Sequence, residues 1–261
     1  EQRVKFDQEL LDAVSRAQAL FIADQSPQET FTALLTELLS VTGSEYGFIG
    51  RVLNSDENQP YLKVFTLTDI SWDEASRRLY DKYADSGMEF TNLDSLFGTV
   101  MKTGEVVISN NPADDPRGCG LPHGHPALNA FLGIPLYSGS ALIGMAGIAN
   151  RPEGYDLELI EMLRPLSSAC AQMIQAFAID QEKERITEEL EHTQRRHEEA
   201  QHVARIGHWE LDLIHNNLIW SKENYRIFGD DFGHANSYET FLERVHPDDR
   251  EFVSCAYADS V

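Results

Sequence analysis

Three side chains capable of metal binding or nucleophilic chemistry lie close together in this sequence. Cys119, His123 and His125 follow the spacing C-x3-H-x-H within seven positions. Zinc and haem iron accept imidazole and thiolate ligands, and a thiolate is also a nucleophile that oxidants attack. The pattern leaves three interpretations open: a structural or incidental cluster, attachment or axial ligation of a tetrapyrrole, and metal binding or redox sensing.

Carboxylates and aromatic residues supply two further candidate groups. Asp114, Asp115 and Arg117 precede the cysteine, and paired carboxylates serve acid–base chemistry. Because they flank Pro116, we interpret them as turn-forming residues. The aromatic side chains that we expect to line a ligand cavity are Trp72, Phe97 and Phe131.

Motifs that would place catalysis on this chain are absent from the sequence. It contains no P-loop, no Rossmann glycine pattern, no G-x-S-x-G elbow and no H-E-x-x-H motif. A kinase motif, a histidine-kinase phosphoacceptor box and a cyclase signature are absent too. We therefore predict that the chain itself is not an enzyme.

Composition narrows the class of partner. The net charge of −22 argues against nucleic acid, because binding to phosphates requires clustered Lys and Arg. No apolar run approaches the roughly 20 residues of a membrane span. Three widely spaced cysteines favour a reducing compartment, so we expect a cytoplasmic protein. The first residue is Glu1 rather than Met, so we expect the chain to be part of a longer protein.

Hydrophobic periodicity predicts an α+β fold. Ser26 and Pro27 are typical of a helix start, and Gly43 is typical of a helix end. A turn at Ser138-Gly139-Ser140 separates two apolar runs, which predicts a β-hairpin. The predicted helices are 4–23, 27–41, 73–84 and 93–102, and the predicted strands are 46–53, 61–68, 105–109, 130–137 and 141–149.

Several short motifs around the hairpin match one family in order. They are Gly124-His125-Pro126, Phe131-Leu132-Gly133-Ile134-Pro135-Leu136, Leu142-Ile143-Gly144 and Gly147-Ile148-Ala149-Asn150. With these residues the chain resembles GAF domains of bacterial signalling proteins over about residues 20–178. The resemblance implies a GAF-type antiparallel sheet with flanking helices. Since some GAF domains attach haem through a cysteine, haem is the specific cofactor that the resemblance suggests.

The loop at 110–130 is the predicted ligand site. A loop of this length, rich in Gly and Pro, cannot fill a core, so we expect it to lie across one face of the sheet. We predict that a small ligand binds between sheet and loop. The residues expected to contact it are Cys119, His123, His125, Phe131, Trp72 and Phe97.

A helical pattern runs from Tyr155 to about Arg205, and we expect Pro165 to interrupt it. Beyond residue 178 apolar and polar residues alternate by four and three, which is a heptad track. Ile179, Ile186 and Leu190 are its apolar positions, and we predict that they form the seam of a parallel homodimer. Polar residues at other core positions should make the dimer weak.

The last segment resembles the first half of a PAS domain. Its motifs are ARIGHWELD, IWSKENYRIFG and FLERVHPDDRE, which lie in PAS order within residues 204–251. The predicted organisation is an N-terminal helix (1–24), a GAF domain (25–178), a coiled-coil linker helix (179–205) and a truncated PAS domain (206–261).

Taken with these resemblances, the sequence predicts a sensory input region of a bacterial signal-transduction protein. The GAF domain would bind a small ligand and pass its state through the helix to the PAS segment. The resemblance implies an output domain, either a histidine kinase or a diguanylate cyclase. Two alternatives stay open: a dimerisation module without ligand, and a GAF-fold redox enzyme that uses Cys119.

Overall fold

In the computed structural model the chain divides into two units, residues 1–181 and residues 182–261. The structure describes residues 8, 10–12, 14–16, 18–19, 21, 26–69, 88–118, 125–229 and 237–259. Within these residues, no helix is both long and apolar enough to cross a membrane.

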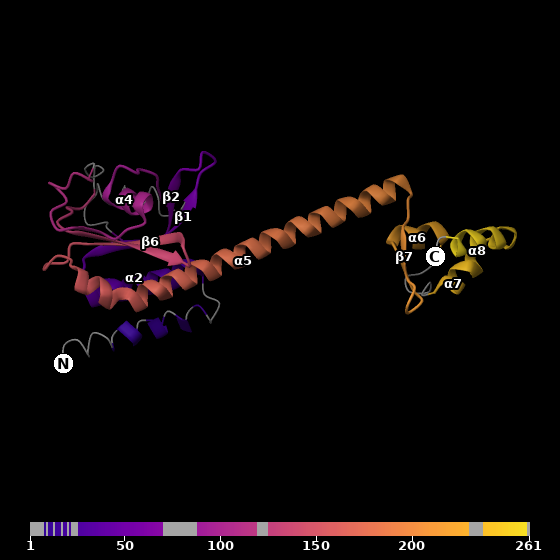
Figure 1. The fold of residues 1–261 in the computed structure, drawn as a ribbon, viewed down its shortest axis with the longest axis horizontal. Helices are drawn as coiled ribbons and strands as arrows, with labels where there is room; N and C mark the ends of the chain where they lie inside the picture. The colour runs from indigo at the N-terminus through magenta and orange to yellow at the C-terminus, as the bar shows by residue number, and fades with distance from the viewer. Residues whose placement is uncertain are drawn as a thin grey trace. The chain divides into compact units, whose positions relative to one another are not determined.

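An antiparallel sheet forms the centre of the first unit (Figure 1). Its described strands follow the order β3-β2-β1-β6-β5-β4, so β1 and β6 lie in the middle. The strands are β1 (Tyr46–Asn54), β2 (Pro60–Leu67), β3 (Glu89–Phe90), β4 (Val107–Ser109), β5 (Phe131–Ser138) and β6 (Ala141–Ala149). The predicted α+β fold is confirmed, and β3 is a two-residue strand that the sequence did not indicate.

The hairpin of β5 and β6 turns where the sequence predicted. Gly139 has a φ of +59°, which a residue with a side chain rarely adopts. In the register of the hairpin, Phe131 pairs with Ala149 and Ser138 pairs with Ala141. Because Phe131 pairs with Ala149, the end of the 110–130 loop and the segment that leads to the following helix lie side by side at the open end of the hairpin.

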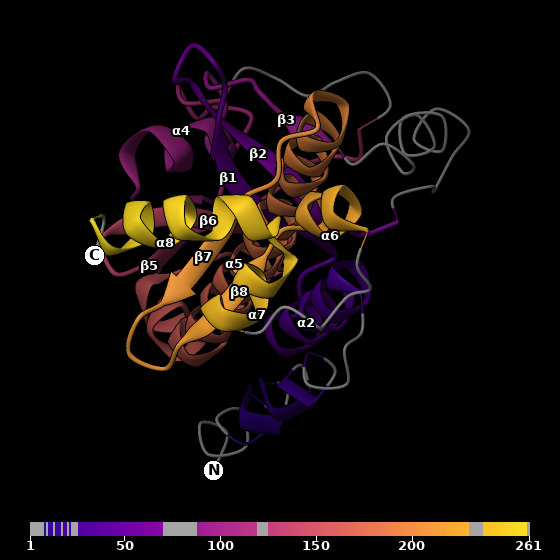
Figure 2. The same cartoon turned by 90° about the vertical axis from the view of Figure 1, so that its right-hand side faces the viewer.

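Helices α2 (Pro27–Thr42) and α5 (Leu157–Ala204) cover one face of the sheet (Figures 1 and 2). A capping box of Ser26 and Glu29 begins α2, and Gly43 ends it in the left-handed conformation, as predicted. The side chains that form this core include Phe31, Leu34, Leu38, Leu132, Ile148, Leu163, Leu166 and Ile174. Leu10, Val14 and Phe21 contact the same core, so the described part of the N-terminal helix lies on this face too.

Helix α4 (Leu96–Thr103) lies on the opposite face of the sheet (Figure 2). Ser95 caps its start by accepting a hydrogen bond from the Gly98 amide, and Gly104 ends it with a φ of +69°. Val100 and Met101 pack against sheet residues of β1, β2 and β6. The predicted helix at 93–102 is confirmed with a later start, whereas the predicted helix at 73–84 lies outside the described residues.

The prediction that Pro165 interrupts the long helix is wrong. Helix α5 is 48 residues long in all and continues through Pro165 without a break. Proline removes one amide donor, which leaves the carbonyl of Glu161 without its helical partner. Both residues are exposed, so water can satisfy that carbonyl, while Leu163 and Leu166 bind this turn to the sheet.

The second unit contains short elements after the end of α5. A hairpin of β7 (Trp209–Asp212) and β8 (Asn217–Trp220) precedes helices α6 (Lys222–Phe228), α7 (Tyr238–Arg244), η1 (Pro247–Asp249) and α8 (Arg250–Ala258). Ser237 caps α7, and Gly229 ends α6 in the left-handed conformation. Its buried core is small and contains Leu218, Trp220 and Tyr225, with Leu211 and Phe241 packed against them.

Candidate functional site

The beginning of the 110–130 loop is fastened to the chain just before α5. The Asn110 side chain donates a hydrogen bond to the Tyr155 carbonyl at 2.9 Å and accepts one from the Tyr155 amide at 2.8 Å. This pair imitates the two hydrogen bonds between neighbouring β-strands. Gly154 has a φ of +72°, and a Cβ there would lie 2.8 Å from the Asn110 Oδ1. A glycine is therefore required for the side chain to approach.

The two carboxylates of the loop, Asp114 and Asp115, each bond to a different side chain within the loop. Arg117 donates to both oxygens of Asp115, at 2.9 and 2.7 Å, and also to the Ile108 carbonyl at 2.8 Å. The hydrogen bonds from Arg117 hold the pKa of the Asp115 carboxyl well below its usual range. Asp114 accepts a hydrogen bond from the Asn111 side chain instead. These contacts shape the loop, which agrees with the interpretation of Asp114, Asp115 and Arg117 as turn-forming residues.

Asn150 fastens the other end of the loop. Its side-chain oxygen accepts from the Asn129 amide at 2.8 Å, and its side-chain nitrogen donates to the Ala127 carbonyl and to Glu45, each at 2.8 Å. The residue is 6% exposed and has a φ of +62°, a conformation that asparagine tolerates better than most residues. The last residue of the Gly-Ile-Ala-Asn motif is thus a clamp for the loop.

His125 lies at this clamped end, half-buried against Tyr46. The two rings meet edge to face, with centroids 5.9 Å apart. The imidazole Nδ1 lies 2.8 Å from the Pro126 carbonyl. Since a carbonyl only accepts hydrogen bonds, Nδ1 must carry the proton, which leaves a lone pair on Nε2 when the ring is neutral. Metal-binding histidines are commonly oriented by this kind of hydrogen bond.

Phe97 and Phe131 belong to one apolar cluster on the α4 face of the sheet. The Phe97 ring lies 5.0 Å from Phe90, which lies 5.0 Å from Phe48. Leu128 packs both against this cluster and against Tyr46, the neighbour of His125. Of the predicted site residues, Phe97 and Phe131 share this cluster and His125 contacts Tyr46, while Cys119, His123 and Trp72 lie outside the described residues.

A buried polar network links the loop anchors to the start of α5. The Tyr155 hydroxyl lies 2.8 Å from the Ser44 hydroxyl, which lies 2.8 Å from the hydroxyl of Thr42. The Arg151 amide donates to the Tyr155 hydroxyl, and the Arg151 side chain donates to the Thr42 carbonyl. Burial raises the pKa of the Tyr155 phenol, so it stays protonated and available as a donor.

Known proteins share the sheet and helices of this first unit. The family model of the GAF domain matches residues 24–175. The chain belongs to the GAF domain family.

Individual relatives of this GAF domain come from different kinds of protein. The methyl sulfide methyltransferase-associated sensor of Methanosarcina acetivorans is 28% identical over 169 residues, which are 62% of this chain and 16% of that protein. The GAF domain of a phosphoenolpyruvate-protein phosphotransferase from Coxiella burnetii aligns with a TM-score of 0.53 at 13% identity. That alignment covers 67% of this chain and 97% of the solved structure, and it concerns the fold.

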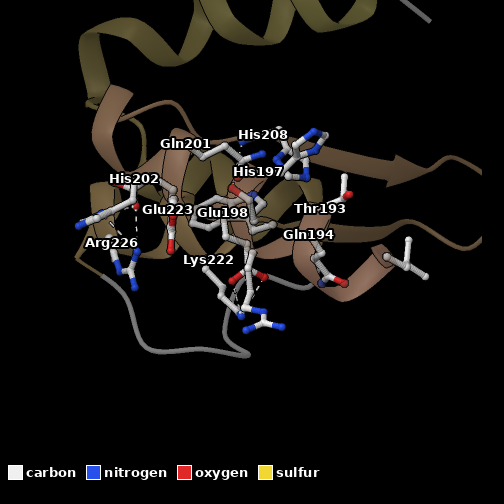
Figure 3. A pocket seen from close by; sticks show the side chains of 15 residues that line it. Thr193, Gln194, His197, Glu198, Gln201, His202, His208, Lys222, Glu223 and Arg226 are labelled. Atoms are coloured by element: carbon white, nitrogen blue, oxygen red, sulfur yellow. Dashed lines mark hydrogen bonds and ion pairs between the residues drawn. The ribbon is translucent and has the colours of Figure 1, made fainter. Parts of the chain in front are cut away.

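A second charged site lies in the C-terminal unit, outside the GAF domain (Figure 3). A cleft of about 780 Å³ separates the last turns of α5 from β8 and α6. The charged or titratable residues that line it are Arg195, His197, Glu198, Glu199, His202, His208, Lys222, Glu223 and Arg226. Among the described residues, no group of three or more histidine, cysteine or acidic side chains has a geometry that suits a metal ion.

Sequence reasoning missed both loop clamps and this cleft. An asparagine after a predicted strand is a local signal for a positive φ, so Asn150 had a recognisable feature. The Asn110–Tyr155 pair joins residues 45 positions apart, and the cleft joins residues more than 20 positions apart. Only the tertiary fold places such pairs together.

Proposed function

We propose that the chain is a sensory input region in which the GAF domain binds a small molecule and α5 transmits the state of that site. Membership in the GAF family and the sensor named among its relatives support a regulatory role. The observation that carries the proposal is the fastening of the ligand loop to Tyr155, two residues before α5 begins. A ligand that displaces the loop would act directly on the start of that helix.

The proposed ligand site lies between the α4 face and the 110–130 loop, with Cys119, His123 and His125 nearest. Haem is the cofactor that we propose, because the Pro126 carbonyl orients His125 so that Nε2 is available as an axial ligand. The adjacent cluster of Phe97, Phe131 and Met101 is apolar enough to accept a porphyrin edge.

Reconstitution with haem tests this site. We expect the full chain to give a Soret absorption band, and we expect Cys119→Ala or His125→Ala to shift or abolish it. His192→Ala is the matched control, because His192 lies on exposed α5 outside the GAF domain and should leave the band unchanged. The site assignment is wrong if no band forms with the parent, or if both loop variants bind haem as the parent does.

The chain is further proposed to form a parallel homodimer along α5. The last buried residue of α5 is Ile174, although apolar residues continue at heptad spacing beyond it. Ile179, Ile186 and Leu190 are 58%, 51% and 65% exposed, so a second helix would bury apolar surface there. Residues 206–261 are proposed to be part of a PAS domain, and an output domain of the histidine kinase or diguanylate cyclase class is proposed for the parent protein.

A dimerisation module without ligand is the second candidate. It is favoured by the packing of the described α4 face, where Leu62, Val100 and Met145 are fully buried. In this case haem and other small molecules would not bind, while the dimer would persist. A redox enzyme of GAF fold would depend on Cys119, because burial raises the pKa of the Cys170 thiol to about 12 and suppresses its thiolate, and Cys255 lies outside the GAF domain.

A further inference from the structure

Charged contacts join the last turns of α5 to α6 within the C-terminal unit. Lys222 on α6 donates to both carboxylate oxygens of Glu198 on α5, each at 2.9 Å. One helical turn further along α5, His202 Nδ1 lies 3.0 Å from a Glu223 carboxylate oxygen (Figure 3). Arg226 donates to the same oxygen at 3.1 Å. The two helices thus meet through two adjacent ionic contacts.

The His202 contact depends on whether the imidazole carries a proton on Nδ1. This nitrogen lies 3.0 Å from the Glu223 carboxylate but also 3.3 Å from Nη1 of Arg226. With a proton, Nδ1 donates to the carboxylate in a charge-assisted hydrogen bond. Without a proton it accepts from Arg226, and it no longer bonds to Glu223. One nitrogen therefore has two exclusive partners on α6.

Glu223 makes this choice consequential, because its side chain is only 7% exposed. A buried carboxylate needs hydrogen-bond donors to stay ionised. The pKa of Glu223 is lowered, chiefly by the hydrogen bond from His202 and further by the one from Arg226. Withdrawal of the His202 donor leaves this carboxylate with one cationic partner, Arg226, among its described contacts.

Other charges in the cleft are balanced. Three cations, Arg195, Lys222 and Arg226, and three carboxylates, Glu198, Glu199 and Glu223, line it. The remaining titratable side chains of the cleft are the imidazoles of His197, His202 and His208. Among the described contacts, His202 is the imidazole of these three that bonds to a carboxylate, whereas protonation of His197 or His208 would add charge without such a partner.

We propose that His202 is a pH-sensitive clamp that ties the end of α5 to α6 when its imidazole is protonated. A protonated ring must donate from Nδ1 to the carboxylate and adds the attraction of its positive charge, whereas a neutral ring can carry its one proton on either nitrogen and makes at most a neutral hydrogen bond to Glu223. The contact also requires ionised Glu223, so it is lost in strong acid, below the lowered pKa of that carboxyl. Such a clamp would give α5 an input at its C-terminal end that is independent of ligand binding in the GAF domain.

Hydrogen exchange of the full chain tests the clamp. We would measure amide protection in α6 at about pH 5.5 and about pH 8, on either side of the ordinary histidine range, and correct for intrinsic exchange rates. A partly exposed ion pair is expected to increase protection at the lower pH about two- to fivefold. His202→Gln should abolish the difference between the two pH values.

Two matched variants separate the clamp from a general effect of cleft charge. His197→Gln and His208→Gln remove imidazoles from the same cleft and should leave the pH difference in α6 as it is in the parent. The proposal is overturned if His202→Gln retains that difference or if His197→Gln removes it.

Discussion

Replacing Asn150 with alanine should destabilise the GAF domain more than its small size suggests. The substitution removes two firm hydrogen bonds, from the Asn129 amide and to the Ala127 carbonyl, each of which contributes about 1 kcal/mol. The bond to Glu45 is more exposed and contributes about half as much. Alanine also pays about 1 kcal/mol to adopt a positive φ. The expected loss is about 3–4 kcal/mol of unfolding free energy.

Two other variants separate these contributions. Asn150→Gly removes the hydrogen bonds without backbone strain, so it should cost about 1 kcal/mol less than alanine. Asn58 has a φ of +58° in the exposed turn between β1 and β2, so Asn58→Ala carries the strain alone and should cost about 1 kcal/mol.

Native-state hydrogen exchange at the amides of β5 and β6 measures this free energy in the full chain. It isolates the GAF domain from the C-terminal unit, whose unfolding would complicate a bulk transition. The role of Asn150 as a clamp would be refuted if the losses of unfolding free energy in Asn150→Ala and Asn58→Ala differed by less than about 0.5 kcal/mol. The difference reports the side-chain hydrogen bonds alone.

Three further predictions concern the helix, the C-terminal unit and the loop. Ile186→Asp should convert the dimer to monomer in light scattering because it places a charge in the seam, whereas Glu188→Gln on the outer face should leave the mass unchanged; a dimer that survives Ile186→Asp would exclude this seam. An isolated 207–261 fragment should melt without cooperativity because its buried core is so small, and a sharp monomeric transition would contradict this. In an NMR titration, Arg117→Gln should return the pKa of Asp115 toward its ordinary range. The stability that the Asp115–Arg117 pair contributes should be present above that range and lost as pH falls. An unmoved Asp115 titration in the variant would show that Arg117 is not the cause of the lowered pKa.

Local signals explain why much of the fold was predictable from sequence. Ser26, Gly43, Gly104 and Gly139 act within a few residues of their own positions, so caps and turns were found correctly. The strands of the hairpin alternate or run apolar between turn residues, which fixes their length. Pro165 was misjudged because its local effect is opposed by the packing of Leu163 and Leu166 on the sheet, which no local pattern encodes.

The candidate site was less accessible to the same reasoning. Phe97, Phe131 and His125 were chosen by residue type; the fold places Phe97 and Phe131 in one cluster and His125 against Tyr46. The residues that shape the site, Asn110 and Asn150, act through backbone partners on other segments. An asparagine is a common surface residue, so its role became clear only when Tyr155 and Ala127 were placed beside it.

The two asparagine clamps make the intervening loop an exchangeable cassette. Asn110 bonds to a backbone amide and carbonyl at Tyr155, and Asn150 bonds to the backbone of residues 127–130. Neither clamp bonds to a described side chain of the loop between them. The entropy of closing a loop also depends only weakly on its length. Changes in this loop that spare Arg117 and Leu128, which contact the sheet, are therefore inexpensive to the sheet. Under the proposed function, a change of ligand would need changes in this loop alone, while the bonds of Asn110 to Tyr155 stayed intact.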